Sequence, residues 1–152
     1  MSLDELYRQV ILDHYRNPRR SGRLDRPDAH ADGTNPLCGD EVAVDLALRD
    51  GHVADARVFG RGCSISQASA SMMADRIVGL STSEVNELVH QIKRLLDIEP
   101  GDAGLDPGRP GAVLGDLESL AGVRRFPVRV KCADLPWATL DEALRTTGDP
   151  HG

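Results

Sequence analysis

The chain has 152 residues, a formal net charge of −6 and an aromatic content of only 3%. This length predicts one domain over residues 1–152 with an aliphatic, alanine-rich core. The acidic balance argues against nucleic acid or an anionic membrane surface as the main partner. No apolar run reaches the roughly 20 residues that span a bilayer, and the N-terminus lacks a signal-peptide pattern, so we expect a cytoplasmic protein.

The N-terminal segment predicts a helix followed by an irregular connection. Ser2 and Glu5 form a capping box, and apolar residues then recur at helical spacing. The helix should end near Asn17-Pro18, because the residue before a proline disfavours the helical conformation. Residues 19–37 are rich in Arg, Asp, Gly and Pro, which indicates a mobile connection with room for one short strand.

A β-hairpin is predicted next. The dipeptide Asp50-Gly51 favours a tight turn between two strands, at residues 41–48 and 52–59. If the pairing continues without interruption, it places Cys38 opposite Cys63. The alternation of apolar residues in the second strand conflicts with that register, so a bulge that shifts it by one residue remains open. Proximity of the two cysteines is the prediction, in either register.

The second half of the chain has helical character, broken by one long segment. Residues 99–115 are rich in Pro and Gly and predict a flexible insertion, and residues 147–152 predict a loose C-terminal tail. Pro127 and Asp134 are alternative starts for a last helix that carries Trp137. The other predicted helical segments are residues 64–78, 81–98 and 116–120.

Three cysteines and one aspartate form the main candidate site. Cys38, Asp40, Cys63 and Cys132 would supply three thiolates and one carboxylate, a complete tetrahedral ligand set for a zinc-like ion. In a reducing compartment such thiols bind metals or react more often than they form disulfides. Cys63 also directly precedes a predicted helix, whose N-terminus favours a thiolate. The residues alone therefore predict a thiolate-rich metal site or a reactive thiol, without choosing between them.

The cysteines and histidines also have simpler interpretations. Buried cysteines often serve as small apolar residues, and the spacing here has no Cys-x-x-Cys pair of the zinc-ribbon kind. The five histidines lie in no metal-binding spacing and are interpreted as surface or core residues. His14, near the end of the first helix, is the one histidine that we single out for examination. The small residues after Cys63 predict a closely packed helix.

Four long stretches resemble the IscU/NifU-N family, over about residues 3 to 145. They are Leu6-Tyr7 with His14-Tyr15-Arg16-Asn17-Pro18-Arg19, Asn35-Pro36-Leu37-Cys38-Gly39-Asp40, Gly62-Cys63 through Met73, and Val123 through Ala133. Within this family, IscU-type scaffolds carry a histidine just before the third cysteine, where this chain has Lys131. SufU-type members lack that histidine and carry an insertion that residues 99–115 resemble. Both features indicate the SufU branch.

The resemblance implies an α+β fold, with a small, three-stranded, mostly antiparallel sheet packed against about five to six helices. It implies a zinc ion (Zn²⁺) held by Cys38, Asp40, Cys63 and Cys132, with Cys38 as the catalytic thiol. The implied activity is that of a zinc-dependent sulfurtransferase. Such a protein takes persulfide sulfur from a SufS-like, pyridoxal-phosphate-dependent cysteine desulfurase and passes it to downstream iron–sulfur cluster assembly proteins.

Two alternatives use the same four residues. One is a non-enzymatic scaffold on which a transient iron–sulfur cluster is assembled, and the other is a purely structural zinc site. Lys131, in place of a histidine, favours sulfur transfer over the scaffold. The small, polar start of the helix after Cys63 and the flanking glycines favour an accessible site over a structural one.

Overall fold

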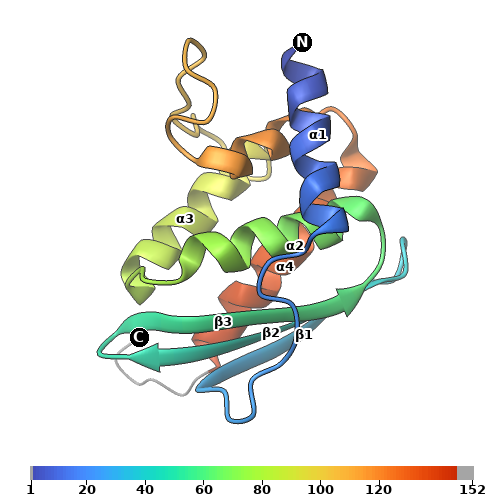
Figure 1. Cartoon of the computed structure of the whole chain (residues 1–152). Helices are drawn as coiled ribbons and strands as arrows, with labels where there is room; N and C mark the ends of the chain where they lie inside the picture. Colours follow the sequence, from blue (N-terminus) through green and yellow to red (C-terminus); the bar gives the residue numbers. More distant parts are fainter. Residues whose placement is uncertain (1, 147–152) are drawn as a thin grey trace.

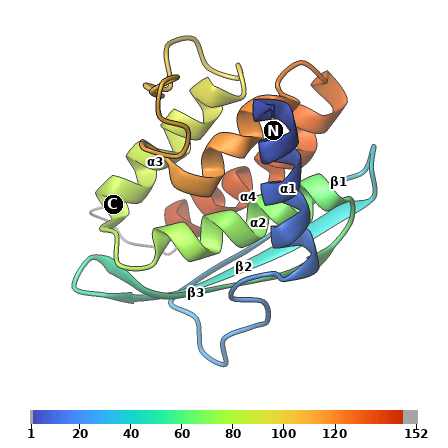
Figure 2. The ribbon, with the colours of Figure 1, turned by 45° about the horizontal axis from the view of Figure 1, so that its top comes forward.

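The computed structural model describes residues 2–146, which form an α+β fold as predicted. Its three strands make an antiparallel sheet in the order β1-β2-β3, and the helices cover one face of that sheet (Figure 1). The turned view in Figure 2 shows the same two layers, with α2 lying along the sheet. In chain order the elements are α1 (Leu3–Arg16), β1 (Ala29–Asn35), β2 (Asp40–Arg49), β3 (His52–Arg61), α2 (Ser64–Ile77), α3 (Thr82–Leu95), the 3-10 helix η1 (Gly115–Val123) and α4 (Pro127–Arg145).

Helix α1 begins at the predicted cap, where Ser2 Oγ accepts a hydrogen bond from the Glu5 N–H at 3.1 Å. The chain then crosses the sheet on the face away from the helices. The Val58 N–H donates to the Arg20 carbonyl at 3.0 Å, and the Asp28 N–H donates to the Leu46 carbonyl at 2.8 Å. The expected irregular connection is therefore hydrogen-bonded to the sheet, and its second part is strand β1.

The β2–β3 hairpin forms with a shifted register. Counted outward from the turn, the pairing shifts by one residue between Leu48 and Ala47. Beyond that point the new register holds, and Val44 faces Val58. This shift brings apolar side chains together on the face that the helices cover, which explains why it occurs. The uninterrupted register, with Cys38 directly opposite Cys63, is therefore wrong, and the bulge lies near the turn.

Small residues let α2 and α4 approach each other closely. Ser69 on α2 is fully buried, and its hydroxyl donates to the Ala133 carbonyl at 2.7 Å. The same oxygen accepts a hydrogen bond from the Trp137 indole N–H at 3.1 Å. Around this contact lies an aliphatic core, as predicted. Its largest fully buried side chains include Trp137, Leu46, Met73, Ile77, Ile92, Leu95, Leu96, Leu117, Leu120 and Leu140.

Helix α4 begins at Pro127 and runs without interruption through Pro136. Proline is favoured at the first position of a helix, where its missing N–H would have no helical partner. Asp134 is therefore wrong as a helix cap: it lies inside α4, with its carboxylate 3.5 Å from Lys93 Nζ on α3. The early start puts Cys132 in the second turn of the helix.

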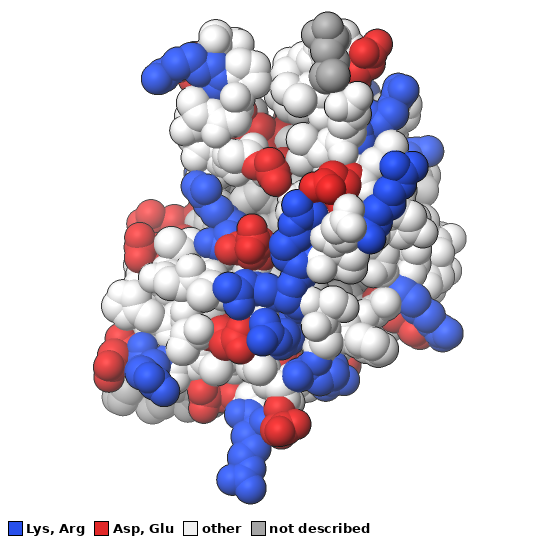
Figure 3. Space-filling model, in the orientation of Figure 1, with Lys and Arg blue, Asp and Glu red and all other residues white. Residues whose placement is uncertain are grey.

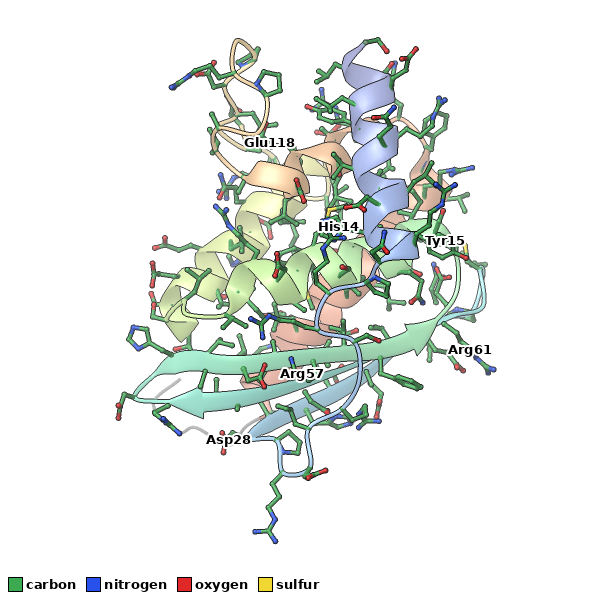
Figure 4. The ribbon with its side chains drawn as sticks, viewed as in Figure 1. His14, Tyr15, Asp28, Arg57, Arg61 and Glu118 are labelled. Atoms are coloured by element: carbon green, nitrogen blue, oxygen red, sulfur yellow. The ribbon has the colours of Figure 1, made fainter. Side chains whose placement is uncertain are left out.

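The predicted insertion has no helix or strand at residues 99–114. Its last part is nevertheless held by the buried carboxylate of Glu118 on η1 (Figure 4). This carboxylate accepts hydrogen bonds from the N–H groups of Gly111 at 2.8 Å, Val113 at 3.0 Å and Leu114 at 2.9 Å. One buried side chain thus organises the turn that leads into η1.

Within residues 2–146, none of the helices has the length and apolarity needed to cross a membrane. The predicted C-terminal tail, residues 147–152, lies outside the described residues. Both kinds of charge occur together on the face shown in Figure 3. Ion pairs among the described residues include Arg19 with Asp13 at 2.7 Å and Arg20 with Asp55 at 3.1 Å.

Candidate metal centre

Three segments meet at the end of the sheet where β3 finishes, marked by Arg61 in Figure 4. The turn between β1 and β2 carries Cys38, and Asp40 is the first residue of β2. Cys63 is the N-cap residue of α2, directly after β3. Cys132 arrives from α4, which packs against β1 and β2. The fold thus brings four residues from distant parts of the chain to one place.

A compact group of three donors lies at the centre of this site. One ligand atom each from Cys38, Asp40 and Cys132 lie within 4.8 Å of one another. The sulfur atoms of Cys132 and Cys38 are 3.4 Å apart. Asp40 and Cys132 are buried, whereas Cys38 is partly exposed. Of the two thiols in this group, the one on the turn is therefore open to solvent.

Cys63 lies at the edge of this group. Its Sγ is 3.8 Å from Asp40 Oδ2, and its backbone N–H donates to Asp40 Oδ1 at 2.8 Å. As the helix cap, its sulfur accepts a hydrogen bond from the Ser66 N–H at 3.5 Å. This position combines the partial positive charge of a helix N-terminus with a fourth donor atom. Three sulfurs and a carboxylate are donors that suit a tetrahedral zinc ion.

The buried thiol has a strongly altered ionisation. Burial raises the pKa of Cys132 well above its usual range, and the nearby Asp40 carboxylate and the Cys38 and Cys63 sulfurs raise it further. Without a cation, the thiolate form of Cys132 is therefore disfavoured. A divalent cation among these donors would reverse that preference, because it offsets the negative charge of the thiolates.

Gly62 makes room for the aspartate. Its φ of +146° lies in a region that side chains rarely adopt, and an added Cβ would lie 2.1 Å from Asp40 Oδ1. The sequence suggested that the flanking glycines open access to the thiols. In the structure, Gly62 lets β3 pass close to the carboxylate of Asp40.

Two side-chain amides, which the sequence did not indicate, also support the site. Asn35 Nδ2 lies 3.8 Å from Cys132 Sγ. With its amide oriented to match its neighbours, Gln67 accepts hydrogen bonds from the N–H groups of Arg61 at 3.1 Å and Gly62 at 3.2 Å. Asparagine in a turn and glutamine on a helix are common. Only the family-like motifs around Cys38 and Cys63, which contain both amides, could have drawn attention to them.

His14 takes part in packing between helices and not in this cluster. It is buried, with Nδ1 2.8 Å from Ser71 Oγ on α2 and Nε2 2.8 Å from Asp116 Oδ2 on η1 (Figure 4). Both ring nitrogens are therefore engaged in joining α1 to its neighbours. Lys131, beside Cys132 in the sequence, is exposed on α4.

Comparisons with known proteins agree with this fold. The family model for the NifU-like N-terminal domain matches residues 6–133. The chain is 41% identical to the zinc-dependent sulfurtransferase SufU of Bacillus subtilis, covering 94% of this chain and 92% of that protein. It is 36% identical to the iron–sulfur cluster assembly scaffold protein IscU of Thermotoga maritima, covering 95% and 96%.

Solved structures superpose on nearly the whole chain. A NifU-like protein (N-terminal) from Brucella abortus superposes with a TM-score of 0.81 at 28% identity, covering 97% of this chain and 98% of the other. A proposed scaffold protein of the SUF system from Fervidobacterium islandicum superposes with a TM-score of 0.80 at 29% identity, covering 94% and 99%. The sequence, the sheet and the donor cluster thus agree, and the chain belongs to the family of the NifU-like N-terminal domain.

Proposed function

We propose that this protein is a zinc-dependent sulfurtransferase for iron–sulfur cluster assembly. It takes persulfide sulfur from a SufS-like, pyridoxal-phosphate-dependent cysteine desulfurase and passes it to downstream assembly proteins. The observation that carries the proposal is a partly exposed thiol, Cys38, grouped with Asp40 and Cys132 within 4.8 Å. The similarity to a Bacillus subtilis protein named as such a sulfurtransferase supports it.

In this proposal Cys38, Asp40, Cys63 and Cys132 hold the zinc ion. The ion, when bound, keeps the thiols deprotonated and shields them from oxidation. Asp40 and Cys132 are buried and act as fixed ligands, and Cys63 is anchored at the N-terminus of α2. Cys38, on a turn, is the ligand best placed to leave.

The transfer step requires only the partner's persulfide. The Cys38 thiolate attacks the terminal sulfur of that persulfide. The sulfur–sulfur bond in the partner breaks, the partner's cysteine leaves as a thiolate, and Cys38 carries the new persulfide. No external oxidant or reductant enters this exchange. A cytoplasmic setting suits it, because the thiols stay reduced there.

The second candidate is an assembly scaffold, favoured by the near full-length similarity to the Thermotoga maritima IscU. Metal content separates the two functions. The sulfurtransferase predicts a colourless purified protein with about one zinc per chain, because the filled d shell of Zn²⁺ gives no visible absorption. A brown protein that contains iron and sulfide would instead support the scaffold.

The decisive assay measures cysteine desulfurase turnover with and without this protein, and with and without a metal chelator. We expect the wild-type protein to stimulate turnover, and the chelator or Cys38→Ser to remove that stimulation. Cys38→Ser should remain folded by circular dichroism. A folded variant that still stimulates the desulfurase would overturn the proposal, and a variant that loses its fold would indicate a structural zinc site.

A further inference from the structure

Asn35 occupies a special place beside the two adjacent thiols. It is the last residue of β1, it is buried, and the turn that carries Cys38 begins with it. Its backbone carbonyl accepts a hydrogen bond from the Cys38 N–H at 3.2 Å. Its side-chain oxygen accepts from the Leu37 N–H at 3.3 Å, and its side-chain Nδ2 points toward Cys132 Sγ at 3.8 Å. One residue therefore contacts both the turn and the buried sulfur.

The two ends of the Asn35 amide serve different purposes. The oxygen shapes the turn, as asparagine and aspartate side chains commonly do. The nitrogen contributes an N–H donor directed at sulfur, which an aspartate could not provide. A donor of this kind stabilises negative charge on a thiolate and fixes its orientation, as the outer hydrogen bonds of metal ligands generally do.

The three cysteine sulfurs differ in the hydrogen bonds that they accept. Cys63 Sγ accepts from the Ser66 N–H at 3.5 Å, and Cys132 Sγ accepts from Asn35 Nδ2 at 3.8 Å. In the described part of the chain, no N–H or O–H group donates to Cys38 Sγ, whose sulfur contact is the Cys132 thiol at 3.4 Å. Two sulfurs thus accept an N–H hydrogen bond that steadies them as ligands. Among the described residues, Cys38 Sγ accepts only from the Cys132 thiol, a bond that is lost once Cys132 is deprotonated.

We propose that Asn35 is a positioning residue, which makes the two adjacent thiolates unequal through its Nδ2–H···Sγ hydrogen bond to Cys132. The bond withdraws electron density from the Cys132 sulfur and holds it in place as a permanent ligand. Cys38 keeps its full nucleophilicity and remains free to leave. This inference rests on the proposed function, because it concerns the same zinc ligands.

The test compares Asn35→Asp, Asn35→Ala and Thr34→Ala. Asn35→Asp retains the oxygen that accepts from Leu37 but removes the donor toward Cys132. Asn35→Ala removes both contacts. Thr34→Ala changes an exposed neighbour on the same strand and is the matched control. The probes are Zn²⁺, measured by competition with a chelating dye, and Co²⁺, measured by the sulfur-to-cobalt absorption band.

We expect Asn35→Asp and Asn35→Ala to bind zinc about 10- to 100-fold more weakly than the wild type, the usual effect of losing an outer hydrogen-bond partner. We also expect the cobalt band of both variants to move to longer wavelength, because a thiolate without its donor is easier to oxidise. Thr34→Ala should match the wild type in both measurements. The band position does not depend on the folded fraction, so partial unfolding cannot imitate the shift.

Two results would overturn this inference. If Asn35→Asp matches the wild type while Asn35→Ala does not, Asn35 acts only through the turn. If neither variant moves the cobalt band, the amide does not bond to the sulfur. Failure of the proposed function looks different, because then the wild-type protein itself would hold no zinc or would not stimulate a desulfurase.

Discussion

Asp40 uses its two carboxylate oxygens for different tasks. Oδ1 accepts the Cys63 N–H at 2.8 Å and so ties the start of β2 to the start of α2. The carboxylate also belongs to the compact group with Cys38 and Cys132. An oxygen ligand is harder than a thiolate and binds zinc less tightly than a fourth sulfur would. We therefore regard Asp40 as the residue that keeps the site easy to rearrange.

Replacing Asp40 with cysteine tests this hypothesis. The Asp40→Cys variant should bind zinc at least about tenfold more tightly, because a four-thiolate site suits zinc better. It should also accept sulfur from a desulfurase more slowly, since Cys38 would leave the ion less readily. Chelator competition measures the first effect and desulfurase stimulation the second. Unchanged sulfur transfer in a variant with tighter zinc binding would contradict this role of Asp40.

The close approach of Gly62 to Asp40 can also be tested by a substitution. An alanine there would place Cβ 2.1 Å from Asp40 Oδ1, so the carboxylate or the strand must move. We expect Gly62→Ala to lower the free energy of unfolding by about 2–4 kcal/mol, through overpacking and backbone strain. It should also weaken zinc binding. Denaturant melts and chelator competition give the two values.

Gly79→Ala is the matched control for that variant. Gly79 also has a positive φ, of +94°, but an added Cβ would meet no atom within 4 Å. This control therefore reports the backbone strain alone. Equal losses in the two variants would mean that contact with Asp40 is not the cause.

At the scale of elements, the segment between α1 and β1 is fixed to the outer face of the sheet through Asp45. This carboxylate is fully buried and accepts hydrogen bonds from Arg23 Nε at 2.9 Å and from the Leu24 N–H at 3.0 Å. His30 Nδ1 bonds to its other oxygen. Burial alone would raise the pKa of Asp45, but the bonds from Arg23 and His30 outweigh it and lower the pKa. The polar cluster thus compensates a buried charge and joins the segment to β2.

This cluster predicts a pH-dependent contribution from His30. Hydrogen bonds to Asp45 and then to Asp32 raise the pKa of His30 above its ordinary value. The resulting stabilisation is fully present below the unfolded pKa of about 6.5 and is lost as pH rises through the raised folded value. His30→Gln should therefore destabilise the protein more at about pH 5.5 than at about pH 9.

The size of this effect should be small. The His30 side chain is 35% exposed, and solvent screening limits the difference to less than about 1 kcal/mol. Denaturant melts of the wild type and of His30→Gln at the two pH values measure it. A larger loss at the higher pH would contradict the assignment of the charged His30–Asp45 pair.

At the scale of the whole molecule, the candidate ligands join parts of the chain that are far apart in sequence. Cys38 and Asp40 flank the start of β2, Cys63 begins α2, and Cys132 lies on α4. A metal ion bound to all four would cross-link the sheet to two helices. Such a cross-link stabilises the folded state, because the unfolded chain has no preformed site.

Removing the metal should therefore lower the melting temperature. With free zinc at about 100 times its dissociation constant, the stabilisation is about 2.7 kcal/mol, or roughly 5–10 °C in Tm for a chain of this size. Calorimetry of the zinc-loaded and chelator-treated protein measures the difference. Adding zinc back should restore the original Tm. An identical Tm in both forms would count against zinc as a bound ligand.

Local sequence signals predicted much of the fold. The cap at Ser2, the turn at Asp50-Gly51 and the helical periodicities all act within a few residues, so they could be identified without the tertiary structure. The four candidate ligands were also identified from residue type. The support from Asn35 was not, because its contact with Cys132 joins residues 97 positions apart in the sequence.

The sequence by itself determined the order and type of the elements, the aliphatic character of the core and the chemistry of the donor set. Only the tertiary structure decided the strand register and the place of Cys132. The register depends on which apolar side chains meet across the hairpin, as Val44 and Val58 do after the shift. Cys132 reaches Cys38 because α4 packs against β1 and β2, whose connecting turn carries Cys38, and closely on α2 around Ser69. Both outcomes follow from packing between segments distant in sequence, which local patterns do not encode.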